Sequence, residues 1–186
     1  MRIISGFLKG KSINFLKNLI TRPLKDSVRE NIFNILKHSK LINTKVEKSE
    51  ILDLYSGVGS FGIECISRGA RKVTFIDKDK KAIGVLEKNL KQLSINNKGE
   101  VFNNKIEVEL EKLDRNKFNI FFLDPPYADK DFTQNLSTIK KNKLFKTDHI
   151  VIIHRERKSE DNIENILNTI LVKQYGRSKI IFGSFT

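Results

Sequence analysis

The stretch that decides the fold is ILDLYSGVGSFG, residues 51–62. It begins with four residues that are apolar except for Asp53, a composition typical of a short strand buried in a sheet. Three glycines follow with the spacing G-x-G-x-x-G, and glycines at such a turn let the backbone bend sharply and let a ligand approach it closely. Residues 62–68 continue as an apolar helix that Gly69 terminates. The stretch therefore predicts a strand, a ligand-binding turn and a helix.

The rest of the chain repeats this alternation of strand and helix. Further buried strands are expected at residues 73–76, 101–102, 118–123 and 150–153. Helices are expected where apolar side chains recur at helical spacing, at residues 83–93, 132–140 and 163–170. A hairpin is expected near the end of the sequence, with its turn at residues 175–178. Continuous apolar strands between amphipathic helices indicate an α/β fold, in which helices cover both faces of a mainly parallel sheet.

The segment before residue 46 is expected to pack on the main domain. Short apolar pieces with glycines in the first twenty residues predict a hairpin. Asp26 is the predicted N-cap of a helix whose apolar positions fall on one face, and Pro23 prevents a much earlier start. At 186 residues the chain can build one substantial core. We therefore expect an N-terminal extension, residues 1–45, and a main domain, residues 46–186, in one compact unit.

A net charge of +13 is the strongest signal in the composition. Nucleic acid is the expected partner, because Lys and Arg that neutralise phosphates release condensed counterions. The alternative is that the lysines only solvate the surface, in a chain rich in residues with A/T-rich codons. Cys65 is the only cysteine, which excludes an internal disulfide and suits a reducing, cytoplasmic compartment. Neither a metal site nor a membrane span is expected from the histidine spacing or the hydropathy pattern.

The turn within residues 53–62 suits an extended adenosine cofactor. Asp53 is placed to take the ligand's ammonium group, directly or through water. The loop residues that would surround the amino-acid and ribose parts are Tyr55, Ser56, Gly57 and Gly59. Asp77 ends the next strand about twenty residues later, where a carboxylate can accept hydrogen bonds from both ribose hydroxyls. An ordinary tight turn with a solvated Asp77 is the alternative, and NAD fits these features as well as S-adenosylmethionine does.

A second motif, Asp124-Pro125-Pro126-Tyr127, directly follows the expected strand at residues 118–123. The amino group of a base is a poor nucleophile because its lone pair is conjugated into the ring. Asp124 can accept one amino N–H and a carbonyl of the Pro125–Pro126 turn the other, which aims the lone pair at a methyl group. The prolines lock the backbone, and Tyr127 can stack on the base. A plain strand-ending turn is the alternative, but this position favours methyl transfer over hydride transfer.

With these motifs the chain resembles the RsmD family of bacterial 16S ribosomal RNA guanine-N2 methyltransferases. Residues 2–11 resemble the family's Arg-Ile-Ile-Gly-Gly opening and the basic-Gly-basic motif after it. Residues 21–34, which include Arg22-Pro23 and Val28-Arg29-Glu30, resemble its most distinctive segment. Residues 52–62 and 67–70 match the cofactor loop and the end of the following helix, and residues 124–127 match the Asp-Pro-Pro-aromatic motif. The resemblance runs nearly end to end.

The resemblance implies a class I S-adenosylmethionine-dependent methyltransferase with a Rossmann-like, seven-stranded, mainly parallel sheet and an antiparallel last strand. It implies S-adenosylmethionine as methyl donor and a guanine N2 of 16S ribosomal RNA in the 30S subunit as acceptor, for an enzyme that we expect to be a monomer. By analogy, Arg22 and Arg29 help to bind RNA, and Asn104 is our choice for the residue that meets the adenine. Arg155 and Arg157 are further candidates for RNA contacts, although a solvated strand end explains them equally well.

Two other functions fit the sequence. Methyltransferases that act on adenine N6 or on a protein glutamine can use the same grip, although the Arg-Pro…Val-Arg-Glu segment favours ribosomal RNA. A non-catalytic RNA-binding assembly factor would keep the same fold. The intact set of Gly57, Gly59, Asp77 and Asp124 argues against that second alternative.

Overall fold

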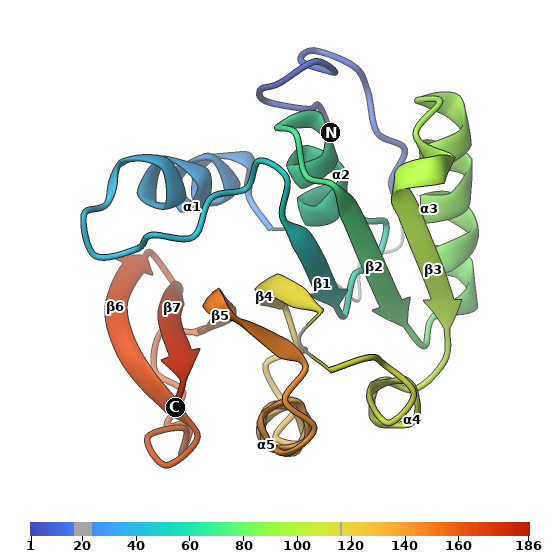
Figure 1. The fold of residues 1–186 in the computed structure, drawn as a ribbon. Helices are drawn as coiled ribbons and strands as arrows, with labels where there is room; N and C mark the ends of the chain where they lie inside the picture. The colour runs from blue at the N-terminus through green and yellow to red at the C-terminus, as the bar shows by residue number, and fades with distance from the viewer. Residues whose placement is uncertain (17–23, 116) are drawn as a thin grey trace.

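The computed structural model describes residues 1–16, 24–115 and 117–186 and contains one seven-stranded sheet (Figure 1). The strands are β1 (Glu50–Leu54), β2 (Lys72–Asp77), β3 (Gly99–Asn103), β4 (Phe118–Leu123), β5 (Phe145–Glu156), β6 (Leu167–Tyr175) and β7 (Ser178–Phe185). Their order across the sheet is β3-β2-β1-β4-β5-β7-β6. Strands β1 to β5 pair in parallel, whereas β7 is antiparallel to both β5 and β6. The expected sheet with an antiparallel last strand is therefore confirmed.

Helices cover both faces of this sheet. They are α1 (Asp26–His38), α2 (Ser60–Ser67), α3 (Lys80–Gln92), α4 (Ile106–Leu110) and α5 (Phe132–Lys141), with a short 3₁₀ turn η1 (Asn96–Lys98) before β3. Figure 1 shows α2 and α3 on one side and α4 and α5 on the other. Two clusters of buried apolar side chains fill the two interfaces. Ile51 of β1 belongs to the first cluster, and Leu52 and Leu54 belong to the second, as the alternation of side chains along a strand requires.

A stack of three phenylalanine rings joins the N-terminal extension to the sheet. The ring of Phe33 on α1 stacks on Phe61 of α2 with centroids 5.2 Å apart, and Phe61 stacks on Phe122 of β4 at 3.9 Å. All three side chains are buried. The extension therefore shares the first apolar cluster with the main domain. The proposed division of the chain at residue 45 stays a prediction.

The N-terminal ribbon, residues 1–16, only partly forms the expected hairpin. It has one antiparallel bridge, between Arg2 and Ser12, and short backbone hydrogen bonds on either side of it. Its main attachment is to α2, where the buried carboxylate of Glu64 accepts the backbone N–H groups of Ile4 and Ser5 at 2.8 and 2.9 Å. The ribbon is thus held by α2 rather than by a ladder of its own.

Two local predictions are wrong. The helix expected at residues 163–170 does not form, because residues 163–166 make a turn and Leu167 begins β6, which pairs along its whole length with β7. A short apolar run at helical spacing also fits a turn followed by a strand. Asp26 is not an N-cap: Lys25 holds that position without a side-chain hydrogen bond, and Asp26 lies in the first turn, where it contacts Arg29. The short helix α4 was not expected.

No helix in the described ranges is both long and apolar enough to cross a membrane. The same ranges contain no group of three or more His, Cys, Asp or Glu side chains arranged to hold a metal ion.

Candidate active site

The two sequence motifs meet at the carboxyl ends of neighbouring strands. β1 lies between β2 and β4, so the loop that leaves β1 is flanked by the end of β2 and by the end of β4. The strand order reverses between β1 and β4, and in open α/β sheets ligands bind in the crevice at such a reversal. Asp53, Asp77 and Asp124 come from these three strands or follow them directly. Burial is the main cause that raises the pKa of Asp53 well above its usual range, and the charges of Asp124 and Asp77 raise it further.

The glycine loop, residues 55–59, has three residues in the left-handed backbone region. Tyr55, Gly57 and Gly59 have φ values of 58°, 54° and 81°. A Cβ on Gly59 would lie 2.3 Å from Cδ1 of the buried Leu86, whereas a Cβ on Gly57 would meet open space. Glycine is therefore required at position 59, whereas Gly57 leaves room for a ligand beside the backbone. A left-handed tyrosine is the kind of local strain that occurs at functional sites.

Asp77 holds the glycine loop from the neighbouring strand. Its Oδ2 accepts the backbone N–H of Gly57 at 2.8 Å, and its Oδ1 accepts that of Asp79 at 2.8 Å. An ionised carboxylate offers about four lone-pair sites, so these two bonds leave room for further donors. The predicted contact of Asp77 with ribose hydroxyls stays a proposal. In this structure Asp77 also fixes the glycine loop through its hydrogen bond with the N–H of Gly57.

Ser56 and Asp53 differ in how well they are satisfied. The hydroxyl of Ser56 is buried and has no hydrogen-bond partner among the described residues, so a bound ligand could supply one. Asp53 is 1 % exposed, and its Oδ2 accepts the backbone N–H of Gly62 at 3.0 Å. Asp53 thus fixes the start of α2. The sequence predicted that Asp53 takes the ammonium group of the ligand directly or through water, and its burial favours contact through water. The site therefore fits a cofactor that carries positive charge: the Ser56 hydroxyl lacks a partner among the described residues, there is free space beside Gly57, and carboxylates lie nearby.

Tyr55 and Asn104 border this region from opposite sides. The phenol oxygen of Tyr55 accepts a hydrogen bond from Asn135 at 3.0 Å, and burial, followed by the charge of Asp129, raises its pKa. Asn104 follows β3, and its side-chain amide is already engaged: Nδ2 donates to Glu109 at 2.6 Å and Oδ1 accepts from the N–H of Lys105. Nδ2 keeps a second N–H and Oδ1 keeps a second lone pair, so an adenine contact through the Asn104 side chain does not require either bond to break, and it stays a proposal.

The Asp124 turn, residues 124–127, contains two acceptors to which no described residue donates a hydrogen bond. The carbonyl of Pro126 accepts the N–H of Asp129 at 2.8 Å and a guanidinium N–H of Arg155 at 3.1 Å. No described residue donates to the carbonyl of Pro125. No described residue donates to Oδ2 of Asp124 either; the hydrogen bond between this carboxylate and His154 involves Oδ1. Of the two proline carbonyls, Pro125 is therefore the one suited to a ligand N–H.

His154 is a residue of the site that the sequence interpretation missed. It follows Ile153, which pairs with Leu123, so it stands beside Asp124 at the ends of β5 and β4. Its Nδ1 lies 2.7 Å from Oδ1 of Asp124, and the ring is 7 % exposed. The ring meets that of Tyr127 edge-on, with centroids 6.0 Å apart. A polar residue directly after an apolar strand, next to another such strand, was the available signal.

Arg155 is buried and bonded within the protein, which argues against the predicted RNA contact in this conformation. It is 2 % exposed and lies over the ring of Phe132 at 4.4 Å. Its guanidinium donates to the carbonyls of Pro126 and Tyr127 and makes a 2.9 Å ion pair with the nearly buried Asp161. These bonds fix the backbone of the Asp124 turn from behind, which leaves no donor facing the solvent.

Arg29 is the second correction. The side chain is fully buried, and its guanidinium donates to the backbone carbonyl of Arg2 at 2.8 Å and to Asp26 at 3.1 Å. Burial lowers its pKa, while the carboxylates of Asp26 and Glu64 act in the opposite direction. Arg29 therefore joins α1 to the N-terminal ribbon and cannot be an RNA contact in this conformation. Arg22 lies outside the described residues, and Arg157 is exposed.

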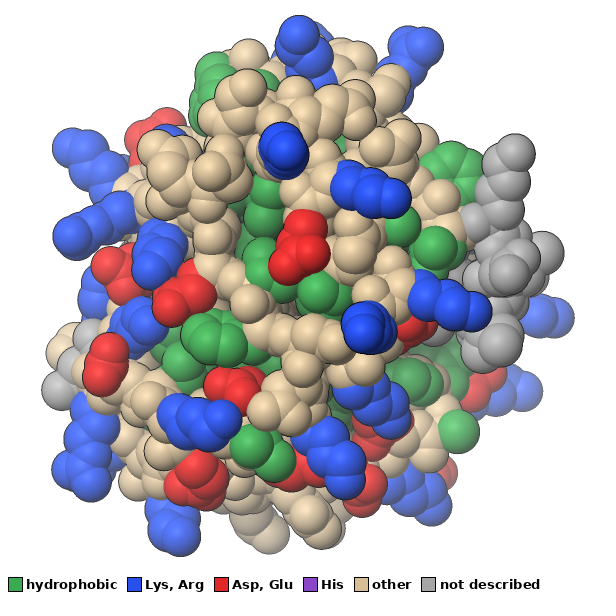
Figure 2. All heavy atoms as spheres, turned by 90° about the vertical axis from the view of Figure 1, so that its right-hand side faces the viewer, with side chains coloured by type: hydrophobic (Ala, Val, Ile, Leu, Met, Phe, Trp, Pro, Cys, Tyr) green, Lys and Arg blue, Asp and Glu red, His purple; other side chains and the backbone are tan. Residues whose placement is uncertain are grey.

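On the face that carries α3 and β3, the Lys and Arg side chains are spread over the surface and do not form one patch (Figure 2). Figure 2 shows Lys and Arg side chains around the whole outline of this face, with Asp and Glu side chains among them mainly in its lower half. Charge by itself thus selects no RNA-binding patch on this face.

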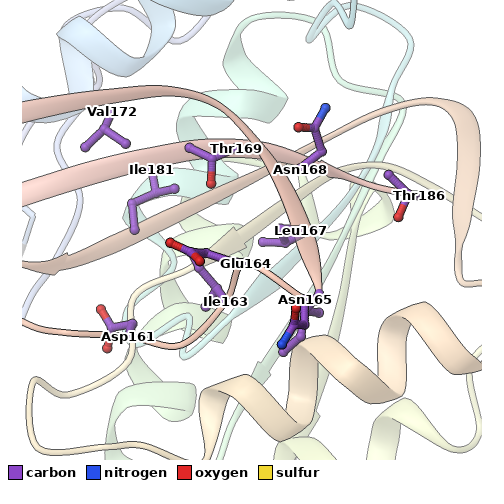
Figure 3. Close-up of a pocket in the computed structure, with 11 residues that line it drawn as sticks. Asp161, Ile163, Glu164, Asn165, Leu167, Asn168, Thr169, Val172, Ile181 and Thr186 are labelled. Atoms are coloured by element: carbon purple, nitrogen blue, oxygen red, sulfur yellow. The ribbon is translucent and has the colours of Figure 1, made fainter.

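A groove of about 610 Å³ lies away from the two motifs, between the loop before β6 and the β6–β7 hairpin (Figure 3). Its lining runs from Asp161 to Thr169 and includes Val172, Ile181 and Thr186. None of the predicted site residues lines it. One of its lining residues, Asp161, is the ion-pair partner of Arg155.

Comparison with known proteins places the chain in a family. The model of the family described as "Conserved hypothetical protein 95" matches residues 1–184. The chain belongs to this family. It is 34 % identical over 185 residues to "Ribosomal RNA small subunit methyltransferase D" of Buchnera aphidicola subsp. Baizongia pistaciae, covering 100 % of this chain and 91 % of that protein. It is also 34 % identical over 162 residues to "Putative rRNA methyltransferase YlbH" of Bacillus subtilis, covering 86 % and 85 % of the two chains.

Solved structures agree on the fold. The "Putative methyltransferase yhhF" from Escherichia coli superposes with a TM-score of 0.84 at 24 % identity, covering 100 % of this chain and 97 % of that one. A "SAM dependent methyltransferase" from Aquifex aeolicus superposes with a TM-score of 0.63 at 15 % identity, covering 88 % and 100 %. At these identities the likeness concerns the fold, which is that of the S-adenosylmethionine-dependent methyltransferases.

Proposed function

We propose that this protein transfers a methyl group from S-adenosylmethionine to the exocyclic N2 of a guanine in 16S ribosomal RNA of the 30S subunit. The observation that carries the proposal is a pair of acceptors, Asp124 Oδ2 and the Pro125 carbonyl, to which no described residue donates; they directly follow β4, the strand next to β1 and its glycine loop. Relatives that are named as small-subunit ribosomal RNA methyltransferases, and that align over most of the chain, support the choice of substrate.

The cofactor would lie against the glycine loop. Ser56 would gain a partner for its buried hydroxyl, and Gly57 would let the ligand approach the backbone. Asp77 would accept the ribose hydroxyls while it keeps the Gly57 N–H, and Asn104 would border the adenine. When bound, S-adenosylmethionine supplies a methyl group whose bond to sulfur breaks, with its electron pair passing to sulfur, as the new N–C bond forms.

The Asp124 turn would hold the acceptor base. Two acceptors match the two N–H groups of one amino nitrogen, and accepting both withdraws the lone pair from conjugation and directs it at the methyl carbon. Tyr127 would stack on the base, a contact worth about 1–3 kcal/mol. Alignment of two bound reactants can supply about 7–11 kcal/mol of a barrier, so positioning is the main source of rate. The nitrogen must then lose one proton, and Asp124 Oδ2 would accept it.

The test is methyl transfer in vitro with labelled S-adenosylmethionine. Purified protein is incubated with 30S subunits from cells that lack the gene, with naked 16S ribosomal RNA, with DNA and with a glutamine-containing protein substrate such as a release factor. We expect label in the ribosomal RNA, recovered after digestion as N2-methylguanosine. Asp124→Ala should abolish the signal, whereas Asp131→Asn, a change at an exposed carboxylate nearby, should preserve it. Label recovered as N6-methyladenine or in protein would refute the proposed acceptor.

A further inference from the structure

His154 contacts both the polar and the aromatic member of the Asp124 turn. Its Nδ1 is 2.7 Å from Asp124 Oδ1, and its ring meets the Tyr127 ring edge-on at 70°. The imidazole is almost buried, whereas the Asp124 side chain is 25 % exposed. The histidine thus supports the carboxylate from the protein side and leaves the other side of Asp124 open to a ligand.

The chemistry of the pair defines the tautomer. An ionised carboxylate only accepts hydrogen bonds, so the ring nitrogen that meets Asp124 must carry the proton. The Nδ1–H then donates its hydrogen bond to Oδ1 of Asp124, and Oδ2 is left as the acceptor for an incoming N–H. A carboxylate that is held at one oxygen also keeps one rotamer, since rotation about its terminal torsion would break the bond.

A second histidine on the same strand provides a comparison. His149 has both ring nitrogens engaged within the protein: Nδ1 bonds the carbonyl of Lys146 at 2.7 Å, and Nε2 accepts the N–H of Phe185 at 2.9 Å. Its ring also packs against Phe145 and Phe185, whose rings stack on each other. His149 is therefore explained by the fold alone. Among the described residues, the His154 imidazole hydrogen-bonds only to Asp124, a residue of the candidate site.

We infer that His154 is a positioning residue for the methyl transfer: its Nδ1–H holds Asp124 Oδ1 so that Oδ2 alone meets the amino group of the acceptor. This inference rests on the proposed function. Oδ2 and the Pro125 carbonyl then form a pair of acceptors of fixed separation, and the amino nitrogen is held at the distance and angle that in-line attack requires. Without the histidine, Asp124 could turn or present both oxygens, and a misplacement of about 1 Å can cost on the order of 10²-fold in rate.

Two substitutions of His154 separate its hydrogen bond from its bulk. His154→Phe keeps a ring against Tyr127 but removes the donor, whereas His154→Asn keeps an N–H near the position of Nδ1. With 30S subunits as substrate, we expect kcat of the Phe variant to fall about tenfold to a hundredfold while KM changes less than about threefold. The Asn variant should stay within about threefold of wild type. A kcat of His154→Phe equal to that of wild type would overturn the positioning role. Equal losses of kcat in folded His154→Phe and His154→Asn would also overturn it.

A spectroscopic measurement tests the hydrogen bond without turnover. The chain has three histidines, so long-range ¹H–¹⁵N spectra can be assigned with single substitutions. His149 serves as the internal reference, because a carbonyl at Nδ1 and an N–H at Nε2 require the Nδ1–H tautomer. We expect the same tautomer for His154, and Asp124→Ala should shift its ring nitrogens while those of His149 stay in place. An Nε2–H tautomer for His154 in the wild-type protein would overturn the inference.

The two arms also separate this inference from the proposed function. If the wild-type protein methylates no 16S ribosomal RNA, the proposed function fails, and the positioning role fails with it. If the wild-type protein is active and His154→Phe is equally active, only the role of His154 fails. Thermal unfolding and cofactor binding, measured for each variant, ensure that only folded proteins are compared.

Discussion

The glycine loop and the Asp124 turn lie on neighbouring strands, yet the protein holds them by different means. The loop is shaped by its own backbone, with three left-handed residues in five, and by Asp77, twenty residues away. The turn has no left-handed residue, and apart from the hydrogen bond between the Pro126 carbonyl and the N–H of Asp129 its side-chain partners come from β5, where His154 bonds Asp124 and Arg155 bonds the Pro126 and Tyr127 carbonyls.

This difference teaches that the two halves of the site should fail in different ways. Changes in the loop act where they are made, through sterics and backbone conformation. Changes around the turn act at a distance, because buried polar partners lose one another when a single residue is replaced. The four predictions that follow test this contrast, from the largest expected effect to the smallest.

Arg155→Met should be the most damaging substitution of a residue that contacts no substrate. It would leave the nearly buried Asp161 without its ion-pair partner and would remove the guanidinium donors of the Pro126 and Tyr127 carbonyls, of which Pro126 keeps the N–H of Asp129. Breaking a buried pair in this way costs about 3–5 kcal/mol, measured as the free energy of unfolding in urea. Arg157→Met, at an exposed neighbour, is the control and should change stability by less than about 0.5 kcal/mol. Adding Asp161→Leu to Arg155→Met should restore part of the loss; no recovery would contradict the pairing.

Gly59→Ala and Gly57→Ala should separate stability from cofactor binding within the loop. The Gly59 variant combines left-handed strain with a methyl group 2.3 Å from Leu86, and we expect a loss of about 2–4 kcal/mol in unfolding free energy. The Gly57 variant meets open space and should lose only about 1–2 kcal/mol, but its methyl group would occupy ligand space. Calorimetry should therefore show at least tenfold weaker S-adenosylmethionine binding for Gly57→Ala. Equal effects of the two changes on stability would contradict this account of the loop.

Asp53 and Asp161 should give opposite pH dependences of stability. Burial raises the folded-state pKa of Asp53, so its contribution to stability falls as pH rises from about 4 through that raised pKa. Burial also acts to raise the pKa of Asp161, but hydrogen bonds from Arg155 and Ser159 outweigh it and lower the pKa. The contribution of Asp161 is therefore present above about pH 4 and is lost as pH falls through the lowered pKa.

Urea unfolding from pH 3 to 8 checks both signs. Asp53→Asn should gain stability relative to wild type as pH rises above about 4, because no charge is buried. Asp161→Asn should be less stable than wild type at pH 7, and the two curves should approach each other in acid. Parallel curves for either variant would remove that residue from the pH dependence.

Arg157→Ala should have the smallest effect. An exposed arginine that contacts one phosphate should contribute about one unit to the slope of log affinity against log salt concentration. Filter binding of 30S subunits at several salt concentrations measures this slope, with Lys143→Ala as a control at an exposed cation elsewhere on the surface. An unchanged slope would show that Arg157 makes no RNA contact.

The sequence predicted the parts of the site whose signals are local. The spacing of Gly57 and Gly59 after an apolar run indicated the cofactor loop, and the prolines after Asp124 indicated the turn. Partners far along the chain were not predictable in the same way. Asp124 and His154 are 30 residues apart and meet only because β4 and β5 pair.

The sequence could not separate buried arginines from surface arginines. Arg29 was expected to contact RNA by analogy with the family, and Arg155 was a candidate for such a contact, but each has acidic and carbonyl partners that only the fold brings within reach. The helix expected at residues 163–170 failed for a related reason. The apolar spacing of Ile163, Ile166 and Leu167 reflects burial, and burial in a turn and a strand gives the same short pattern.

The most direct test of the central claim is nucleoside analysis by mass spectrometry of 16S ribosomal RNA from cells with and without the gene. The account predicts that one N2-methylguanosine disappears when the gene is deleted. Wild-type protein should restore it, whereas Asp124→Ala, made to the same level, should not. An unchanged 16S profile in the deletion strain, or full restoration by Asp124→Ala, would contradict the account.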